Sequence, residues 1–409
     1  RNYEVVLFIE LLFLVGIGHQ QGSNIWEFAD RAAHYFHRPG DQFPRFPQGL
    51  LYRVDRLVEI LAHYVSWLAF CDLGDYLVSG CRSLVEFVVL LKIIAYTVRI
   101  LMCRSVFLFL CLMVFAAAST DGAVAKPNIV YILADDMGIG DVMSLSKRCK
   151  IATPNLDRLA AEGMVFTDAH SSSSVCTPTR YAILTGRYNW RSRIKSGVCW
   201  GWSRRLIENG RMTVGSFLQE QGYETAAFGK WHLGMNWPLK GGGFADDGDT
   251  HQKDFKDAYN VDYSKPVQQG PTTVGFDHFF GISASLDMPP YVFIRDDQPV
   301  VKKIVTKGFN RNGPADVDFE AVDVLPRITE ETVKFIWDHA GQAKQGKPFF
   351  VYFPLNAPHT PISPTKQFQG KSGLNKYGDF VMQVDWTVGQ VMEALESSGV
   401  AENTLLVFT

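Results

Sequence analysis

The sequence lacks an excess of charge of either sign. Its 409 residues include 40 Lys and Arg and 42 Asp and Glu, which gives a formal net charge of −2. A protein that binds nucleic acid through its overall charge is strongly basic, so we expect no nucleic-acid partner. Apolar residues are plentiful, since 47% of the residues are hydrophobic and only 20% are charged. This composition excludes a fully disordered chain and allows a large core.

Methionine is absent from the first part of the chain, because all 10 methionines lie at Met102 or later. The use of basic residues changes at the same point, from eight Arg and one Lys before Met102 to 13 Arg and 18 Lys from there on. We interpret residues 1–101 as upstream sequence that is read through in frame, with translation starting at Met102. The alternative is a genuine hydrophobic N-terminal region in which residues 84–101 span a membrane.

A long uninterrupted apolar run is also lacking. Charged side chains interrupt residues 84–101 at Glu86, Lys92 and Arg99. The uninterrupted run 106–118 is shorter than the roughly 20 apolar residues that a membrane-spanning helix needs. We therefore expect no stable membrane span.

The run 106–118 has the features of a signal peptide instead. A short basic segment precedes it from Met102, and an A-x-A-like cleavage site follows at residues 123–125. We expect residues 102–125 to direct export, to a periplasm, a lumen or the exterior, and the mature chain to begin at Lys126. That part holds three of the seven cysteines, an odd number that leaves one unpaired where disulfides can form.

From Lys126 onward, short apolar runs alternate with segments of helical periodicity. Buried strands are predicted at residues 128–134, 223–228, 348–355 and 404–408, and helices from residue 154 and at 213–222, 329–343 and 377–398. This alternation predicts an α/β fold with a mostly parallel central sheet flanked by helices. The glycine-rich polar stretch 240–270 is predicted to be a surface insertion. In such sheets the active site lies beyond the carboxyl ends of the strands.

Four polar clusters lie where that rule places chemistry. The first is the pair Asp135 and Asp136, directly after the strand at 128–134. Adjacent carboxylates repel each other unless a cation lies between them, which favours a site for a hard metal ion. The alternative for such a pair is a solvated turn whose aspartates cap a helix.

The second cluster surrounds Cys176, which comes just before a helix that begins near Pro178. The N–H groups and the positive dipole end of a helix favour an anion there, and Arg180 adds a permanent positive charge. On its own, the cysteine could equally be a disulfide partner beside a capping region.

The third and fourth clusters supply a lysine and two histidines. Lys230 and His232 are expected on the same side of an extended segment, because side chains alternate there. His359 follows the strand at 348–355 in the run N-A-P-H. Single residues of these types are more often surface charges or satisfied core groups than catalysts, so the order of the four clusters carries the inference.

The second cluster resembles the first signature of the sulfatase family, C-x-P-S-R-x-x-x-[LM]-T-G. The chain reads C-T-P-T-R-Y-A-I-L-T-G over residues 176–186, with Thr179 where Ser is usual. Residues 229–234 read G-K-W-H-L-G and resemble the second signature. All four clusters occur in family order within residues 126–409. The chain is thus similar to formylglycine-dependent, arylsulfatase-like sulfatases, which implies an alkaline-phosphatase-like α/β fold.

The resemblance implies a sulfuric ester hydrolase and a role for each matching residue. Cys176 matches the cysteine that a formylglycine-generating enzyme oxidises, and the hydrated aldehyde is the nucleophile. Asp135, Asp136 and the modified residue 176 match ligands of a calcium ion, for which magnesium is the alternative. Arg180 matches the residue that holds the hydrate, and His232 matches the histidine bonded to it.

Three further residues match the part of the family's site that binds sulfate. Lys230 and His359 match residues near the leaving group, and Ser285, in the run G-I-S-A-S-L-D, matches a polar residue near the sulfate. The expected substrate is an aryl sulfate or a sulfated carbohydrate.

The sequence departs from the family's pattern at its end. In sulfatases the strand that matches residues 404–408 is followed by S-D-N-G, which completes the metal site, and later by a small C-terminal subdomain. This sequence stops at Thr409. We therefore expect residues 126–409 to be the N-terminal part of a sulfatase catalytic domain, truncated at the C-terminus and weak or inactive by itself.

Two rival functions remain open. A phosphate or phosphonate ester hydrolase of the same superfamily would share the sheet and the Asp-rich metal site, but its nucleophile is typically Ser or Thr rather than Cys176. An inactive sulfatase-like protein that binds sulfated glycans would fit the short set of metal ligands. The intact Cys176, Arg180 and Lys230 favour an enzyme.

Overall fold

The computed structural model describes Lys92, residues 126–246 and residues 257–409. The predicted read-through segment 1–101, apart from Lys92, and the predicted signal peptide 102–125 lie outside the described residues. In the described part, no helix combines the length and the apolar character needed to cross a membrane.

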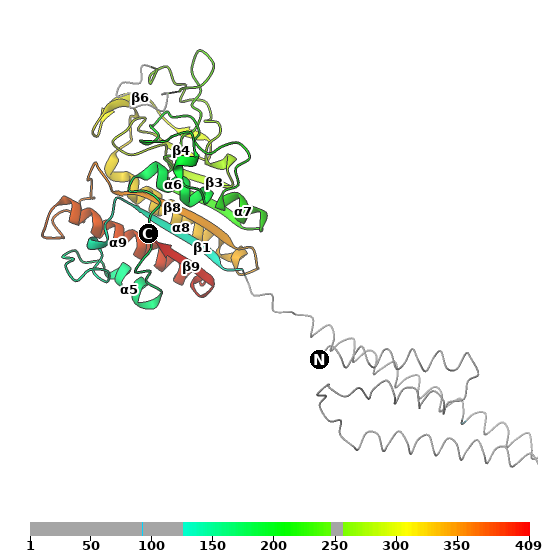
Figure 1. The fold of residues 1–409 in the computed structure, drawn as a ribbon, viewed down its shortest axis with the longest axis vertical. Helices are drawn as coiled ribbons and strands as arrows, with labels where there is room; N and C mark the ends of the chain where they lie inside the picture. Colours follow the sequence, from blue (N-terminus) through cyan, green and yellow to red (C-terminus); the bar gives the residue numbers. More distant parts are fainter. Residues whose placement is uncertain (1–91, 93–125, 247–256) are drawn as a thin grey trace, which may run out of the picture. The chain divides into compact units, whose positions relative to one another are not determined.

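The described residues form a seven-stranded central sheet and a separate two-stranded sheet. The strands are β1 (Asn128–Asp135), β2 (Glu224–Lys230), β3 (His278–Ile282), β4 (Phe293–Arg295), β5 (Gln298–Val300), β6 (Ile304–Gly308), β7 (Asn312–Asp316), β8 (Phe349–Pro358) and β9 (Thr404–Phe408). The order in the central sheet is β5-β4-β3-β2-β8-β1-β9 (Figure 1). β3, β2, β8, β1 and β9 are parallel, whereas β4 and β5 add an antiparallel edge. The predicted mostly parallel sheet is therefore confirmed.

Helices cover both faces of the central sheet (Figure 1). The α-helices of the described part are α5 (Pro154–Glu162), α6 (Cys176–Thr185), α7 (Val214–Glu220), α8 (Val324–Ala343) and α9 (Lys376–Ser397). Short 3-10 turns are η1 (Ile139–Asp141), η2 (Asn189–Arg191), η3 (Pro271–Thr273), η4 (Ala321–Asp323) and η5 (Ala401–Asn403). Side chains of α5, α8 and α9 belong to the core on one face, and those of α6 and α7 to the core on the other.

The central strands are apolar throughout because their side chains alternate between the two cores. In β8, Val351 and Phe353 belong to the core with α8 and α9, whereas Phe350 and Tyr352 belong to the opposite core. All four side chains are buried. A strand that is covered on both faces reads as a continuous apolar run, which is why β8 could be predicted.

The longest predicted elements are confirmed, with shifted ends. The apolar face predicted for α9 is buried at all five positions, Phe380, Val384, Val388, Val391 and Leu395. Helix α8 begins at Val324, five residues before the predicted start. Pro326 lies in its first turn, where a proline is tolerated because the backbone N–H has no helical partner. Strands β3 to β7, which have three to five residues each, were not predicted.

The predicted surface insertion at residues 240–270 is mostly exposed in its described part, but several of its apolar side chains are buried. Ala245, Val261 and Tyr263 are buried in the core that contains α6 and α7. Isolated bridges pair Leu239 with Val261 and Asn236 with Gln268. The stretch is therefore a largely exposed segment that is anchored to the core by a few apolar side chains.

Candidate active site

Three of the four predicted clusters meet at one edge of the central sheet. Asp135 is the last residue of β1, Lys230 is the last residue of β2, and His359 directly follows β8. Because β8 lies between β1 and β2 and is parallel to both, their carboxyl ends share an edge. The sheet therefore places these residues as the sequence predicts.

Asp135 is buried at this edge between two cations. Nζ of Lys230 lies 2.5 Å from Oδ2 of Asp135, and Nη2 of Arg180 lies 3.5 Å from Oδ1. Burial raises the pKa of Asp135, but the charges of Lys230, Arg180 and His359 outweigh it and lower the pKa to about 2. The carboxylate is therefore ionised at neutral pH.

Ser285 connects Lys230 to His359. Its Oγ lies 3.0 Å from Nζ of Lys230 and 3.2 Å from Nδ1 of His359. On the other side of the imidazole, Nε2 of His359 lies 3.5 Å from Oδ2 of Asp136. The residues matched to sulfate binding therefore form one continuous network, which includes Ser285 from the loop after β3.

Cys176 lies at the start of α6, which brings the second cluster to the same edge. It is the first helical residue rather than the residue before the helix, and Arg180 lies one turn later on the same helix face. The hydroxyl of Thr177 donates to the carbonyl of His232 at 2.9 Å and accepts from the N–H of Cys199 at 3.0 Å. These bonds hold the start of α6 against the segment that follows β2. The Cys176 thiol is partly buried and forms no disulfide, and the same holds for Cys149.

His232 lies where the backbone turns away from β2. Its φ of 55° is left-handed, so the expectation that Lys230 and His232 lie on the same side of an extended segment is wrong. The turn at Gly234 explains the difference. A Cβ there would lie 2.1 Å from the carbonyl oxygen of Arg204, so this backbone approach requires glycine.

The imidazole of His232 is buried and neutral. Nε2 lies 2.7 Å from the carbonyl oxygen of Cys199, which can only accept, so Nε2 carries the proton. Burial, followed by the charges of Lys230 and Arg180, holds the pKa of His232 well below its usual range. Nδ1 is then a buried acceptor, and it makes no hydrogen bond with any described residue.

The residues matched to calcium offer the type of ligand atom that the ion prefers, but too few of them. Asp135 and Asp136 offer hard oxygen atoms, and the side chain of Asp136 is 55% exposed. Within the described ranges, these two and Cys176 do not bring three ligand atoms within 4.8 Å of one another. Lys230 and Arg180 also engage the Asp135 carboxylate, so an ion would share it with two cations. Calcium takes about 6–8 oxygen ligands, so further donors are required.

Asn356 offers a further oxygen that the sequence analysis did not assign. It lies in β8 two residues before Pro358, whose Cα pairs with that of Asp135. Both polar atoms of its buried side chain lack a hydrogen-bond partner among the described residues. A buried amide without partners is costly, so it points to a ligand at this edge. The sequence analysis also did not assign Thr177 and Cys199, which hold the start of α6 and the His232 ring. Their contacts join segments far apart in the sequence.

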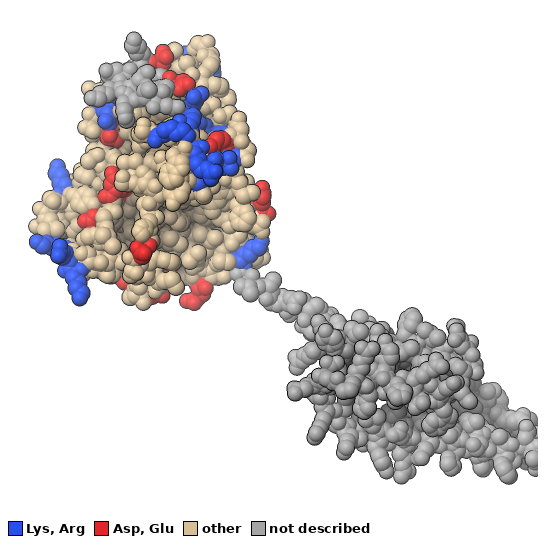
Figure 2. All heavy atoms as spheres, viewed as in Figure 1, with Lys and Arg blue, Asp and Glu red and all other residues tan. Residues whose placement is uncertain are grey.

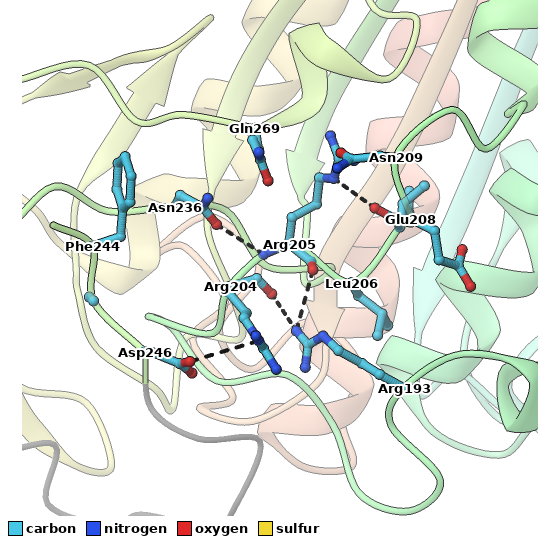
Figure 3. Close-up of a pocket in the computed structure, with 12 residues that line it drawn as sticks. Arg193, Arg204, Arg205, Leu206, Glu208, Asn209, Asn236, Phe244, Asp246 and Gln269 are labelled. Carbon is cyan, nitrogen blue, oxygen red and sulfur yellow. Dashed lines mark hydrogen bonds and ion pairs between the residues drawn. The ribbon is translucent and has the colours of Figure 1, made fainter.

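A separate hollow lies beyond the backbone that follows β2 (Figure 3). It has a volume of about 570 Å³, and its lining includes none of the predicted site residues. Arg193, Arg204 and Arg205 line it, but their guanidinium groups are already engaged by backbone carbonyls, Asn209 and Asp246. Figure 2 shows basic and acidic side chains side by side on the face in view. The hollow therefore adds nothing to the chemistry of the motif residues.

Comparison with known proteins shows that this chain is similar to sulfatases. An N-acetylgalactosamine-6-O-sulfatase of Bacteroides thetaiotaomicron is 32% identical over 331 residues, which cover 69% of this chain and 58% of that protein. Arylsulfatase A of Bos taurus is 33% identical over 302 residues, which cover 72% of this chain and 53% of that protein. The chain spans between half and three fifths of the length of these curated relatives.

A solved structure shows the same fold. It comes from work on the metabolism of multiple glycosaminoglycans by Bacteroides thetaiotaomicron, and it is 31% identical with a TM-score of 0.59. The match covers 69% of this chain and 62% of that one. The sulfatase family model matches residues 127–409, which contain all four clusters. The chain therefore belongs to the sulfatase family and has its alkaline-phosphatase-like α/β fold.

Proposed function

We propose that this chain hydrolyses sulfate esters at the edge formed by β1, β2 and β8. One observation carries the proposal: Lys230 contacts both Asp135 and Ser285, and Ser285 in turn contacts His359. Donors from three segments, those of Lys230, Ser285 and His359, thus converge beside the Asp135 carboxylate. Family membership supports the reaction type.

The residues of this chain stabilise negative charge. Lys230, Ser285 and His359 present N–H and O–H donors to the sulfate and to the leaving oxygen. Because charge builds on that oxygen as the S–O bond breaks, donors fixed in advance stabilise the transition state more than the bound substrate. Asp135 is needed because it keeps the Lys230 ammonium buried and oriented.

The nucleophile requires a change to Cys176. Its conversion to formylglycine by a formylglycine-generating enzyme would supply a hydrated aldehyde at the start of α6. Arg180, on the same helix face, would hold that group, and the bare Nδ1 of His232 would accept a hydrogen bond from it. His232 suits this role because it is neutral and its other nitrogen is fixed on Cys199.

Asp135 and Asp136 would hold a calcium ion, or magnesium as the alternative, together with residue 176. The ion would supply positive charge that polarises a sulfate oxygen. The carboxyl end of β9 brings Thr409 beside β1, where its carbonyl accepts from the N–H of Ala134 at 2.7 Å. With only the donors that the described residues offer, we propose weak metal binding and slow turnover.

The proposed substrate is a sulfated carbohydrate, with an aryl sulfate as the alternative. A relative named N-acetylgalactosamine-6-O-sulfatase and a structure from work on glycosaminoglycan metabolism support the carbohydrate. Arylsulfatase A supports the alternative. Export through the signal peptide at residues 102–125 is part of the proposal, because sulfated glycans are largely extracellular and the sequence there has the required pattern.

The test is hydrolysis by chain co-expressed with a formylglycine-generating enzyme. A chromogenic aryl sulfate, the matching aryl phosphate and a 6-sulfated N-acetylgalactosamine are compared, with excess calcium and with a chelator. We expect slow sulfate release that needs calcium, is absent in Cys176→Ala and exceeds phosphate release. Faster phosphate release would assign the chain to the phosphohydrolases. Binding of sulfated glycan without turnover dependent on Cys176 would show a non-enzymatic binder.

A further inference from the structure

A second group of metal-ligating side chains lies at the opposite end of the sheet from the candidate active site. Glu224 begins β2, His278 begins β3, and His339 lies in α8. One ligand atom from each lies within 4.8 Å of the others. Lys230 ends the same strand that Glu224 begins, so about 20 Å of β2 separate the two sites.

The imidazole of His339 is oriented for a metal. Its Nδ1 lies 2.8 Å from the carbonyl oxygen of Phe335, one helical turn earlier, so Nδ1 carries the proton. Nε2 therefore keeps its lone pair. The ring also stacks on Phe335, with 4.0 Å between centroids and 24° between planes. A hydrogen bond from the other ring nitrogen to a carbonyl is the usual arrangement of a metal-bound histidine.

The other two donors are paired with each other. Nε2 of His278 lies 2.8 Å from Oε1 of Glu224, and the side chain of His278 is 42% exposed, which leaves a path for an ion. Burial raises the pKa of Glu224, but hydrogen bonds from Lys347 and His278 outweigh it and lower the pKa. The carboxylate is thus ionised at neutral pH.

We propose that Glu224, His278 and His339 bind a divalent transition metal of the zinc type. Two imidazoles and one carboxylate suit zinc, nickel or copper and not calcium, which prefers oxygen atoms alone. Water would fill the remaining position. The ion would join α8 to β2 and β3 and so stabilise the fold, and it takes no part in sulfate-ester chemistry.

Lys347 is the competitor for this site. Its ammonium bonds to Oε2 of Glu224, while its side chain is 51% exposed and is free to move into solvent. A metal ion must share Glu224 with this charge or displace it. Removing the charge should therefore tighten metal binding, which is an effect that a purely structural ion pair would not produce.

The test is titration of the full chain with zinc, followed by calorimetry and thermal unfolding. We expect the wild type to bind one equivalent of zinc and to show a higher Tm with zinc. Both effects should be lost in His278→Gln and in His339→Gln. His170→Gln is the control, because His170 is 73% exposed, pairs with Asp168 and lies outside the group. Circular dichroism of the metal-free variants is the control that each variant folds.

A second variant makes the proposal sharper. Lys347→Gln should bind zinc roughly 1.5- to 5-fold more tightly, as expected for the loss of one exposed competing charge. Cobalt should give visible absorption bands in the wild type that vanish in His339→Gln. If both histidine variants keep the full zinc stoichiometry, or if Lys347→Gln binds zinc more weakly, the proposal is wrong.

Discussion

Lys230 reaches across the end of β8 to bond Asp135, with 2.5 Å between Nζ and Oδ2. The two residues end strands that are not neighbours, since β8 lies between β1 and β2. Both side chains are buried, at 0% and 2% exposure. A buried ion pair costs desolvation energy and adds little net stability, so its value here is the fixed position of the ammonium.

Replacing Asp135 should make the free energy of unfolding less dependent on pH in the acid range. Its pKa of about 2, against an ordinary value of 3.8, means that the carboxylate adds stability above about pH 4 which is lost as pH falls toward 2. The loss is roughly 2 kcal/mol, at about 1.4 kcal/mol per pKa unit. Urea unfolding from pH 2 to 6 should show this difference between wild type and Asp135→Asn. Asp168→Asn, at an exposed carboxylate, should keep the wild-type slope.

Modification should be confined to Cys176. Co-expression with a formylglycine-generating enzyme should give one aldehyde per chain, because C-T-P-T-R carries the Cys, Pro and Arg of the family signature. An aldehyde-specific probe with peptide mass spectrometry measures it. Cys149→Ala is the matched control, since Cys149 is also free and partly buried. Equal labelling of wild type and Cys176→Ala would contradict the assignment.

The effect of the Ser285 hydroxyl on turnover can be distinguished from an effect on local packing. Ser285→Ala should lower the turnover of an aryl sulfate by about 10²-fold, because a fixed donor to the developing charge is lost. Ser283→Ala is the control. Ser283 is also buried and lies two residues earlier, but its hydroxyl bonds to no described residue. Equal losses in the two variants would show a packing effect only.

His232 should stay neutral across the physiological range. Burial and the charges of Lys230 and Arg180 lower its pKa, so nitrogen NMR should show the Nε2–H tautomer from pH 5 to 8. Below about pH 6.5 the His232 imidazole binds a proton in the unfolded chain but not in the native state. The free energy of unfolding therefore falls as pH falls. Titration of His232 within this range would refute the assignment.

Gly229 should tolerate no side chain. Its φ is 128°, and an added Cβ would lie 2.0 Å from the carbonyl oxygen of Pro354 in β8. Gly229→Ala should therefore cost more than about 3 kcal/mol and displace Lys230. Gly242→Ala, at φ 91° with nothing within 4 Å of the added Cβ, should cost only about 1–2 kcal/mol. Similar midpoints in urea for the two variants would contradict this.

The sequence by itself determined the parts whose signal is local. The apolar runs of β1 and β8 and the helical face of α9 predicted the layered α/β fold, because burial on both faces of a parallel sheet leaves a continuous apolar run. The sequence around Pro178 predicted a helix just after Cys176 that carries Arg180, although the helix begins at Cys176 itself. The strand-end rule placed Asp135 and His359 at one edge.

Only the tertiary structure decided how distant segments meet. The bonds of Ser285 to Lys230 and His359 span 55 and 74 residues of chain, and no local pattern fixes such contacts. The same holds for the core position of Val261 and for the group formed by Glu224, His278 and His339. Such contacts form because the sheet register and the packing of α8 bring the segments together, and that register depends on the whole core at once.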